Sequence, residues 1–261
     1  MKILIRRIYI RLFSRNKFLR KINKKILHLA LSASGYNNFN NMFDSGEEFF
    51  IKKYLGDRDI KLCIDIGANT GNYSSLILEN TNSKVISFEP LPFVFKKMKK
   101  NLSKYSHRCL FINKGVGATD GNLDIFFNKN SSSFASFSKD ANKVNYVSNK
   151  SKLNIQVVTI DGFCRENNIK EIDLLKIDAE GFEKEVIHGA LQTIKKIKPK
   201  YIQLEFNIHQ LFRNTSLNYF AEILFEYDVY QLKFNDMEKI DPRDPLSNIY
   251  LFSNFVFKLK K

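Results

Sequence analysis

The sequence predicts an α/β fold in which a mostly parallel sheet has helices on both faces. Two stretches carry this prediction. Lys61 to Pro90 has the pattern strand, glycine turn, helix, strand, and Ile172 to Ala190 has the pattern strand, turn, helix. The last two predicted strands, Tyr230 to Phe234 and Asn248 to Lys258, favour an antiparallel hairpin at the sheet edge. At 261 residues, the chain is long enough for one such domain with an extension.

The first stretch has the layout of a nucleotide-like cofactor site. An apolar strand ends at Asp65, Gly67 allows a sharp turn off the strand, and Gly71 allows close approach at the start of the next helix. Glu89 ends the following strand, at roughly the spacing where an acid meets a ribose in βαβ units. A tight turn in some other α/β domain would also explain the glycines alone, but the flanking strand, helix and acid favour a cofactor.

The spacing also indicates which cofactor. Asp65 to Gly71 reads DIGANTG, which differs from the GxGxxG that places backbone amides on a pyrophosphate. An acid before the turn would repel phosphate and suits a cationic ligand. S-adenosylmethionine therefore fits better than NAD, and we expect Val116, in the turn Gly115 to Gly117, near its adenine.

The second stretch concentrates ionisable residues at the end of a strand. Lys176 lies inside an apolar strand and needs a carboxylate partner, while Asp178 falls at the carboxyl end, where open parallel sheets bind ligands. Glu180 and Glu183 follow closely. We favour a catalytic site over the alternative of ion pairs that fix the turn.

A further strand, Tyr201 to Phe206, brings Glu205 to the same edge, with His209 just after it. The candidates for a general base are Asp178, Glu180 and Glu205, with His209 in second rank. Asp178 and Glu205 are chemically able to hold Mg²⁺, but we predict no bound metal. The polar segment 128 to 152 is a candidate lid.

Residues 1–44 form a predicted basic amphipathic arm and connector, and residues 45–261 the catalytic domain. The arm, 1 to about 31, is expected to be one helix with an apolar stripe. Ten of the 42 Lys and Arg residues precede the first acid, Asp44. The stripe members are Ile8, Leu12, Leu19, Ile22, Ile26 and Leu29.

Such an arm suits an anionic membrane surface, and packing against the domain is an equal alternative. Nucleic acid is a less favoured partner. The sequence has no apolar run of about 18 residues that would predict a transmembrane helix. With scattered cysteines that predict neither zinc nor disulfides, we expect a cytoplasmic protein, peripheral at the inner membrane face.

Several strings resemble the FkbM-type S-adenosylmethionine-dependent methyltransferases. They cover about Glu47 to Asn207, and KIDAEGFEKEVIHGA is the most specific. The strings are DIGANTGNYS from Asp65, FEP from Phe88, GVGATDGNLDIFF from Gly115, VVTIDGF from Val157, KIDAEGFEKEVIHGA from Lys176, and LEFN from Leu204.

The resemblance implies a Rossmann-like class I methyltransferase with a seven-stranded sheet, and methyl transfer to a hydroxyl of a sugar, in surface polysaccharide, or of a secondary metabolite. It implies that Asp65, Gly67, Asn69 and Gly71 meet the methionine part and Glu89 the ribose, while Asp178 borders cofactor and acceptor. Two alternatives remain: an inactive adaptor of the same fold at a membrane, and a nucleic-acid methyltransferase.

Overall fold

The body of the protein is built on one large mixed sheet. The computed structural model describes residues 2–56, 58–129 and 131–261. The strands of the large sheet are β1 (Leu62–Ile66), β2 (Lys84–Phe88), β3 (Cys109–Ile112), β8 (Leu174–Ile177), β9 (Tyr201–Phe206), β10 (Tyr227–Lys233), β11 (Asp236–Lys239) and β12 (Ser253–Leu259). Their order is β11-β10-β12-β9-β8-β1-β2-β3, and the run from β9 to β3 is parallel throughout. The predicted α/β class with a mostly parallel sheet is confirmed.

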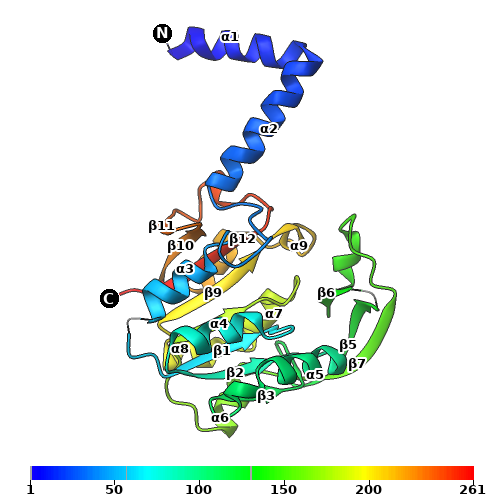
Figure 1. Ribbon diagram of the computed structural model, residues 1–261, viewed down its shortest axis with the longest axis vertical. Coiled ribbons are helices and arrows are strands. Elements are labelled where there is room, and N and C mark those ends of the chain that lie inside the picture. Colours follow the sequence, from blue (N-terminus) through cyan, green and yellow to red (C-terminus); the bar gives the residue numbers. More distant parts are fainter. Residues whose placement is uncertain (1, 57, 130) are drawn as a thin grey trace.

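Helices cover both faces of this sheet (Figure 1). Cys63 and Leu174 pack with the helices on one face, whereas Ile64, Leu175 and Ile177 belong to the core on the other, as strand alternation predicts. The first face carries α3 (Glu47–Phe50), which continues into a π-helical turn at Ile51–Gly56, α4 (Asn72–Asn80) and α5 (Pro92–Asn101). The second carries α6 (Ile160–Glu166), α7 (Glu183–His188), α8 (Leu191–Ile197) and α10 (Leu217–Ile223).

A second, smaller sheet stands beside the large one. It contains β4 (Gly115–Val116), β5 (Gly121–Asn128), β6 (Ser131–Ser136) and β7 (Ser151–Val158), in the order β4-β7-β5-β6. The segment 128–152, predicted to be a polar loop, thus contains β6 and a 3₁₀ turn at Lys139–Lys143; residue 130 lies outside the described residues. Its Val144 and Val147 pack with Ile208 of α9 (Ile208–Phe212), so it also contacts the edge of the large sheet.

The predicted count of seven strands was wrong, because the large sheet has eight among the described residues. The additional strand is β11, which pairs antiparallel with β10 and forms the edge hairpin. β11 contains one apolar residue, Met237, so hydrophobic alternation could not reveal it. The two strands predicted as the hairpin, β10 and β12, are antiparallel neighbours, and β12 lies between β10 and β9.

The arm consists of two helices, α1 (Lys2–Arg15) and α2 (Lys17–Ala33), so the prediction of a single helix was wrong. The chain is extended at Asn16, whose side chain accepts hydrogen bonds from the backbone N–H groups of Phe18 and Leu19. This side-chain cap competes with continuation of the helix and starts a new one. Residue 1 lies outside the described residues.

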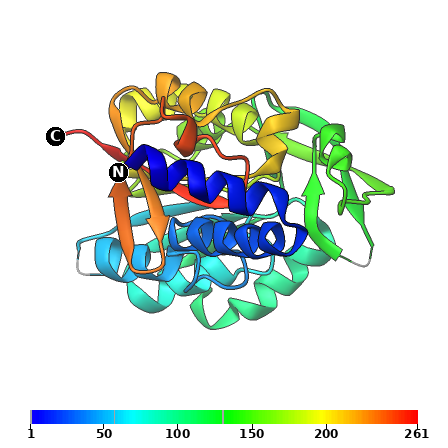
Figure 2. The same ribbon diagram turned by 90° about the horizontal axis from the view of Figure 1, so that it is seen from above.

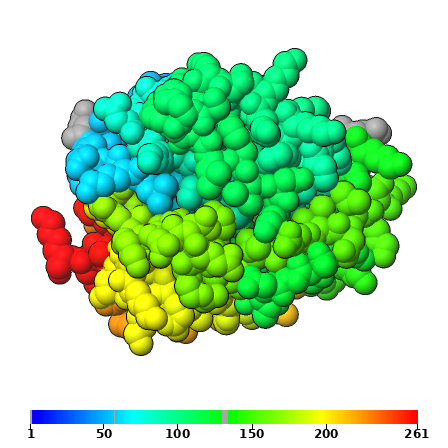
Figure 3. Space-filling view, turned by 90° about the horizontal axis from the view of Figure 1, so that it is seen from below, coloured from blue at the N-terminus to red at the C-terminus, as the bar shows by residue number. Residues whose placement is uncertain are grey.

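The two arm helices stand off the body (Figure 1) and lie over it when seen from above (Figure 2). Neither contains a buried residue. Of the predicted stripe, Ile8, Leu12, Ile26 and Leu29 are about half exposed or more, whereas Leu19 and Ile22 are half-buried, so most of the stripe is not packed on the domain. Figure 3 shows the opposite face of the body, where the arm does not reach. No described helix is both long and apolar enough to cross a membrane.

The connector after α2 is joined tightly to the body. Tyr36 is buried in the core and its hydroxyl donates to the backbone carbonyl of Leu246 at 2.7 Å. The Asn37 N–H donates to the Phe252 carbonyl, and the Ser253 hydroxyl donates to the Gly35 carbonyl. The end of the arm is therefore fixed beside β12.

Candidate active site

The turn after β1 can accept no side chain at Gly67. Gly67 has a φ of +78°, and an added Cβ would lie 1.8 Å from the backbone oxygen of Asp178. The N–H groups of Gly67 and Ala68 both donate to the Phe88 carbonyl at the end of β2. The turn is thus held against the ends of β2 and β8, which brings Asn69 beside Glu89.

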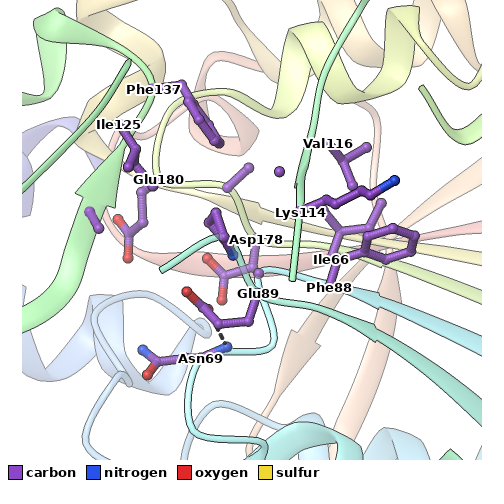
Figure 4. A pocket seen from close by; sticks show the side chains of 15 residues that line it. Ile66, Asn69, Phe88, Glu89, Lys114, Val116, Ile125, Phe137, Asp178 and Glu180 are labelled. Atoms are coloured by element: carbon purple, nitrogen blue, oxygen red, sulfur yellow. Dashed lines mark hydrogen bonds between the residues drawn. The ribbon is translucent and has the colours of Figure 1, made fainter. Parts of the chain in front are cut away.

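Glu89 braces this turn from the end of β2. Its carboxylate accepts from the N–H groups of Asn69, at 3.0 Å, and Leu91, at 2.8 Å. The residue is 6% exposed. Burial raises the pKa of Glu89 to about 7, although both hydrogen bonds lower it. Figure 4 shows Glu89, Asn69, Asp178 and Glu180 around one cavity.

Two cavities meet at this turn. The inner cavity, of about 70 Å³, extends from Glu89 to Val116 of β4. The connector cavity, of about 420 Å³, is lined by Asn69, Thr70, Asn72 and Tyr73 on one side of the chain and by connector residues 39–42. Gly67, Asn69 and Asp178 line both. Of the predicted cofactor residues, these cavities bring together Gly67, Asn69, Glu89, Val116 and Asp178.

The other two predicted cofactor residues lie beneath the turn and line neither cavity. Asp65 is fully buried and accepts a hydrogen bond from the Ser74 hydroxyl at 2.6 Å. Gly71 faces the side chains of Leu102 and Met98, which an added Cβ would meet at 2.8 and 3.1 Å. The space that Gly71 provides is thus used by the packing of α4 on α5 and on Leu102, which follows it.

Lys176 has the carboxylate partners that its buried position requires. Its Nζ lies 2.9 Å from Asp178 and 3.4 Å from Asp65, and it also lies 5.2 Å from the centroid of the Tyr73 ring. Burial alone would lower the pKa of Lys176, but Asp178, Asp65 and Glu47 together raise it. The lysine therefore stays charged and holds Asp178 at the mouth of the connector cavity.

Three carboxylates converge at the carboxyl edge of β8 and β9. One oxygen each from Asp178, Glu180 and Glu205 lies within 4.8 Å of the others. Burial, followed by the charges of neighbouring carboxylates, raises the pKa of both Glu180 and Glu205. The Asn207 amide donates to Glu205 at 2.6 Å.

His209 adjoins this cluster from α9. Its Nε2 lies 3.2 Å from Glu180, and its side chain is 2% exposed. Burial lowers the pKa of His209, which favours the neutral imidazole near pH 7. All four predicted catalytic residues are thus neighbours, and each is able to accept a proton.

Glu183, in contrast, holds the loop between β8 and α7. Its carboxylate accepts from the N–H groups of Ala179 and Gly181 and from the Gln210 amide, at 2.8 to 3.1 Å. Burial raises its pKa to about 7. Its hydrogen bonds fit the alternative role that the sequence left open, a brace for the turn after the strand.

A third cavity, of about 730 Å³, lies on the far side of Glu180, and we call it the aromatic cavity. Its lining combines polar side chains with aromatic walls. The polar lining residues are Asn37, Glu180, Glu205, Asn207 and His209, and the aromatic wall residues are Phe39, Phe134, Tyr146, Tyr250 and Phe252.

Comparison with known proteins assigns the family. A model of the "Methyltransferase FkbM domain" matches residues 65–231 of the chain. The chain belongs to the FkbM methyltransferase family. The crystal structure of methyltransferase FkbM from Methylobacillus flagellatus has a TM-score of 0.50 and 17% identity, and covers 80% of this chain and 47% of that one. It supports the fold.

Two curated relatives also resemble the FkbM domain. The hexuronic acid methyltransferase AglP of Haloferax volcanii is 21% identical over 144 residues, which are 55% of this chain and 56% of AglP. The 2-O-methyltransferase NoeI of Sinorhizobium fredii is 24% identical over 161 residues, 57% of this chain and 64% of NoeI. The match thus spans less than two thirds of each relative.

The carboxylate cluster of this FkbM domain has the chemistry of a divalent cation site, since Asp178, Glu180 and Glu205 supply oxygen ligands. The same three groups also suit proton transfer without a metal. Our expectation of no bound metal stays a prediction.

Sequence reasoning missed part of the FkbM domain's site. Gln203 donates to Glu47 at 3.0 Å and accepts from the Tyr73 hydroxyl, and Glu47 and Tyr73 line the connector cavity. The sequence did contain a signal for this part of the site: Gln203 is a polar residue inside an apolar strand, as Lys176 is, and therefore needs a polar partner. The connector residues 39–42 gave no such signal, because nothing in an Asn-rich segment indicates which cavity it covers.

Proposed function

We propose that this chain is an S-adenosylmethionine-dependent O-methyltransferase. Its acceptor is a hydroxyl group, either of a sugar in a surface glycan or of a secondary metabolite. The observation that carries the proposal is the position of the carboxylate cluster. It lies directly beside a glycine turn and a ribose-type acid at the carboxyl edge of a parallel sheet. The names of the two relatives, which act on a hexuronic acid and at a 2-O position, agree with it.

The residues present fit this cofactor. Glu89 lines the inner cavity and offers carboxylate oxygens to ribose hydroxyls. Glu47 and Asp178 line the connector cavity, where their carboxylates suit the ammonium of the amino-acid tail. When bound, the cofactor supplies a methyl group on a positively charged sulfur.

The chain's own residues then have two tasks. They hold the acceptor hydroxyl in line with that methyl, and they remove its proton as the new carbon–oxygen bond forms and the carbon–sulfur bond breaks. Glu180 is the first candidate base, because it lines both the inner and the aromatic cavity. A raised pKa makes a carboxylate a stronger base. His209, 3.2 Å from Glu180, is the second-rank candidate base, because its imidazole is neutral near pH 7.

Calorimetric binding of S-adenosylmethionine and S-adenosylhomocysteine tests the cofactor. We expect micromolar affinity for the wild type and a loss of about 10- to 100-fold for Glu89→Ala, the effect of losing hydrogen bonds to a charged group. Glu79→Ala is the matched control, because Glu79 is exposed and lines neither cavity. If the folded wild type binds neither compound, the proposal fails and the adaptor becomes the better hypothesis.

We also propose that residues 1–33 hold the enzyme at an anionic membrane surface. The arm has ten cations and no acid, and most of its large apolar side chains are exposed. Deleting residues 1–33, which leaves the buried Gly35 and Tyr36 in place, should abolish sedimentation with phosphatidylglycerol vesicles and leave cofactor affinity unchanged. If the full chain fails to bind these vesicles, or binds phosphatidylcholine vesicles equally well, the membrane role is wrong.

A further inference from the structure

Glu180 connects the aromatic cavity to the inner cavity. It lines both, with a positive φ of +49° that turns the chain between them. Asp178, which borders the inner and connector cavities, lies in the same carboxylate cluster. A molecule in the aromatic cavity would therefore contact two members of the cluster, Glu180 and Glu205.

The lining of the aromatic cavity suits a ring with one apolar face and polar edges. Phe134 lies 5.4 Å from Tyr146, and Phe39 lies 6.0 Å from Phe252, each distance between ring centroids. Such aromatic pairs offer flat apolar surfaces against which the C–H face of a sugar ring packs. The polar lining residues offer carboxylate and amide groups to the hydroxyls of the sugar.

The aromatic cavity is lined by acidic residues and by no Lys or Arg among the described residues. The acidic residues are Glu180 and Glu205. The nearest buried cation of the cluster, Lys176, is already paired with Asp178 and Asp65. Arg213, near α9, is paired with Asp140 and Glu185. Where Glu180 and Glu205 are ionised, they repel a bound anion. Where they are protonated, they still offer no cation to replace the water that the anion loses on binding, so an anion is disfavoured in either state.

We propose that the aromatic cavity is the acceptor site and that it selects an uncharged sugar ring over a sugar acid. This inference rests on the proposed methyltransferase function, and it gives that function a substrate class. The ring packs on the aromatic walls, and its hydroxyls donate to Glu180 and Glu205. A hexuronic acid, the substrate in the name of the relative AglP, brings a carboxylate that this lining repels.

Two matched probes test the inference: methyl β-D-glucopyranoside and methyl β-D-glucopyranosiduronate, which differ only at C6. Binding to the full-length protein with S-adenosylhomocysteine is followed by saturation-transfer difference NMR, with EDTA present. We expect the glucoside to bind and the glucuronide to bind at least about tenfold more weakly, the factor that one unfavourable charge contact of about 1.4 kcal/mol produces. Equal or tighter binding of the glucuronide, or binding of neither probe, would overturn the inference.

Variants assign the effect to the cavity. Tyr146→Ala should weaken glucoside binding, because Tyr146 lines the aromatic cavity and neither of the other two. Leu246→Ala, at an exposed position outside the cavity, should leave it unchanged. Glu205→Gln should narrow the gap between the two probes, because it removes one repelling charge. Each variant is first shown to be folded by circular dichroism. Equal effects of the two alanine variants would contradict the assignment.

Two controls distinguish acceptor selectivity from a non-functional cofactor site and from metal binding. Calorimetry with S-adenosylhomocysteine measures binding at the cofactor site alone. Absent binding in that measurement would contradict the proposed function, whereas the sugar titration tests only the acceptor site. Repeating the glucuronide titration with MgCl₂ in place of EDTA tests for a cation on the carboxylates. Glucuronide binding that appears only with Mg²⁺ would show that the cluster holds a metal and would overturn selection by charge.

Discussion

Lys176 shows how much a single buried charge organises at this site. The cation satisfies two carboxylates, one beneath the turn after β1 and one at the end of β8. Removing it would leave Asp65, which is fully buried, without a counter-charge.

We therefore expect Lys176→Met to lower the free energy of unfolding by about 3 kcal/mol or more, the usual effect of removing one partner of a buried pair. Lys198→Met is the control. Lys198 lies 2.6 Å from Glu226, but the two side chains are 45% and 35% exposed, so its loss should cost at most about 1 kcal/mol. Urea denaturation measures both values, and similar losses would show that the Lys176 pairs contribute little.

At this scale the sequence predicted chemistry better than it predicted contacts. A lysine inside an apolar strand must find an acid, so its partners followed from energetics. Asp65 and Gly71 belong to the same motif as Gly67, yet they support the turn from below. Which members of a motif face a ligand depends on the helices packed behind it, here α4 and α5 with Leu102 after it.

At the scale of elements, the turn after β1 and the end of β8 are in contact through backbone atoms. The Asp178 carbonyl occupies the space that a side chain at Gly67 would need. The position of the carboxylate cluster relative to the turn at Gly67 is thus set by main-chain packing.

Gly67→Ala should displace this turn and lower the free energy of unfolding by at least about 2 kcal/mol, since it combines a left-handed φ with a backbone clash. Cofactor affinity should fall with it. Gly56→Ala is the control, because φ there is not positive and the nearest atom lies 3.3 Å from the added Cβ. Thermal melting and calorimetry measure the two effects; unchanged affinity in Gly67→Ala would separate the turn from the cofactor.

Elements with strong periodicity were predicted, and elements fixed by tertiary contacts were not. The buried strands β1, β2, β8 and β9 are mostly apolar. β6 reads Ser-Ser-Ser-Phe-Ala-Ser, which has no alternation, and it exists because β5 offers an edge. Likewise, the break at Asn16 depends on a side-chain cap that an apolar stripe does not reveal.

On the scale of the whole molecule, the protein buries several carboxyl groups around one edge of its sheet. The pKa values of Glu89 and Glu183 are raised from about 4.5 to about 7, with burial as the largest cause in each case. A carboxyl group whose pKa is raised in the folded state stabilises the fold at pH values below its unfolded-state pKa, near 4.5. This contribution is lost as the pH rises through the folded-state pKa, about 7.

The cofactor-free protein should therefore become less stable between pH 5 and pH 8, with a slope of up to about 1.4 kcal/mol per pH unit for each such group. Glu183→Gln should flatten this slope, because its amide cannot ionise. The exposed Glu222 provides a control, Glu222→Gln, that should leave the slope intact. Denaturation curves at several pH values give the slope, and a wild-type stability that rises over this range would contradict the expectation.

The small sheet has an evolutionary consequence. Residues 121–158 form one continuous stretch, and they supply Ile125 and Phe137 to the inner cavity and Phe134 and Tyr146 to the aromatic cavity. The carboxylates that would do the chemistry all come from the large sheet and the turns that follow it. Recombination of this one stretch between homologous genes would exchange part of the lining of both cavities in a single event and leave the carboxylate cluster in place. If the aromatic cavity is the acceptor site, as we propose, this is a short route to a new acceptor.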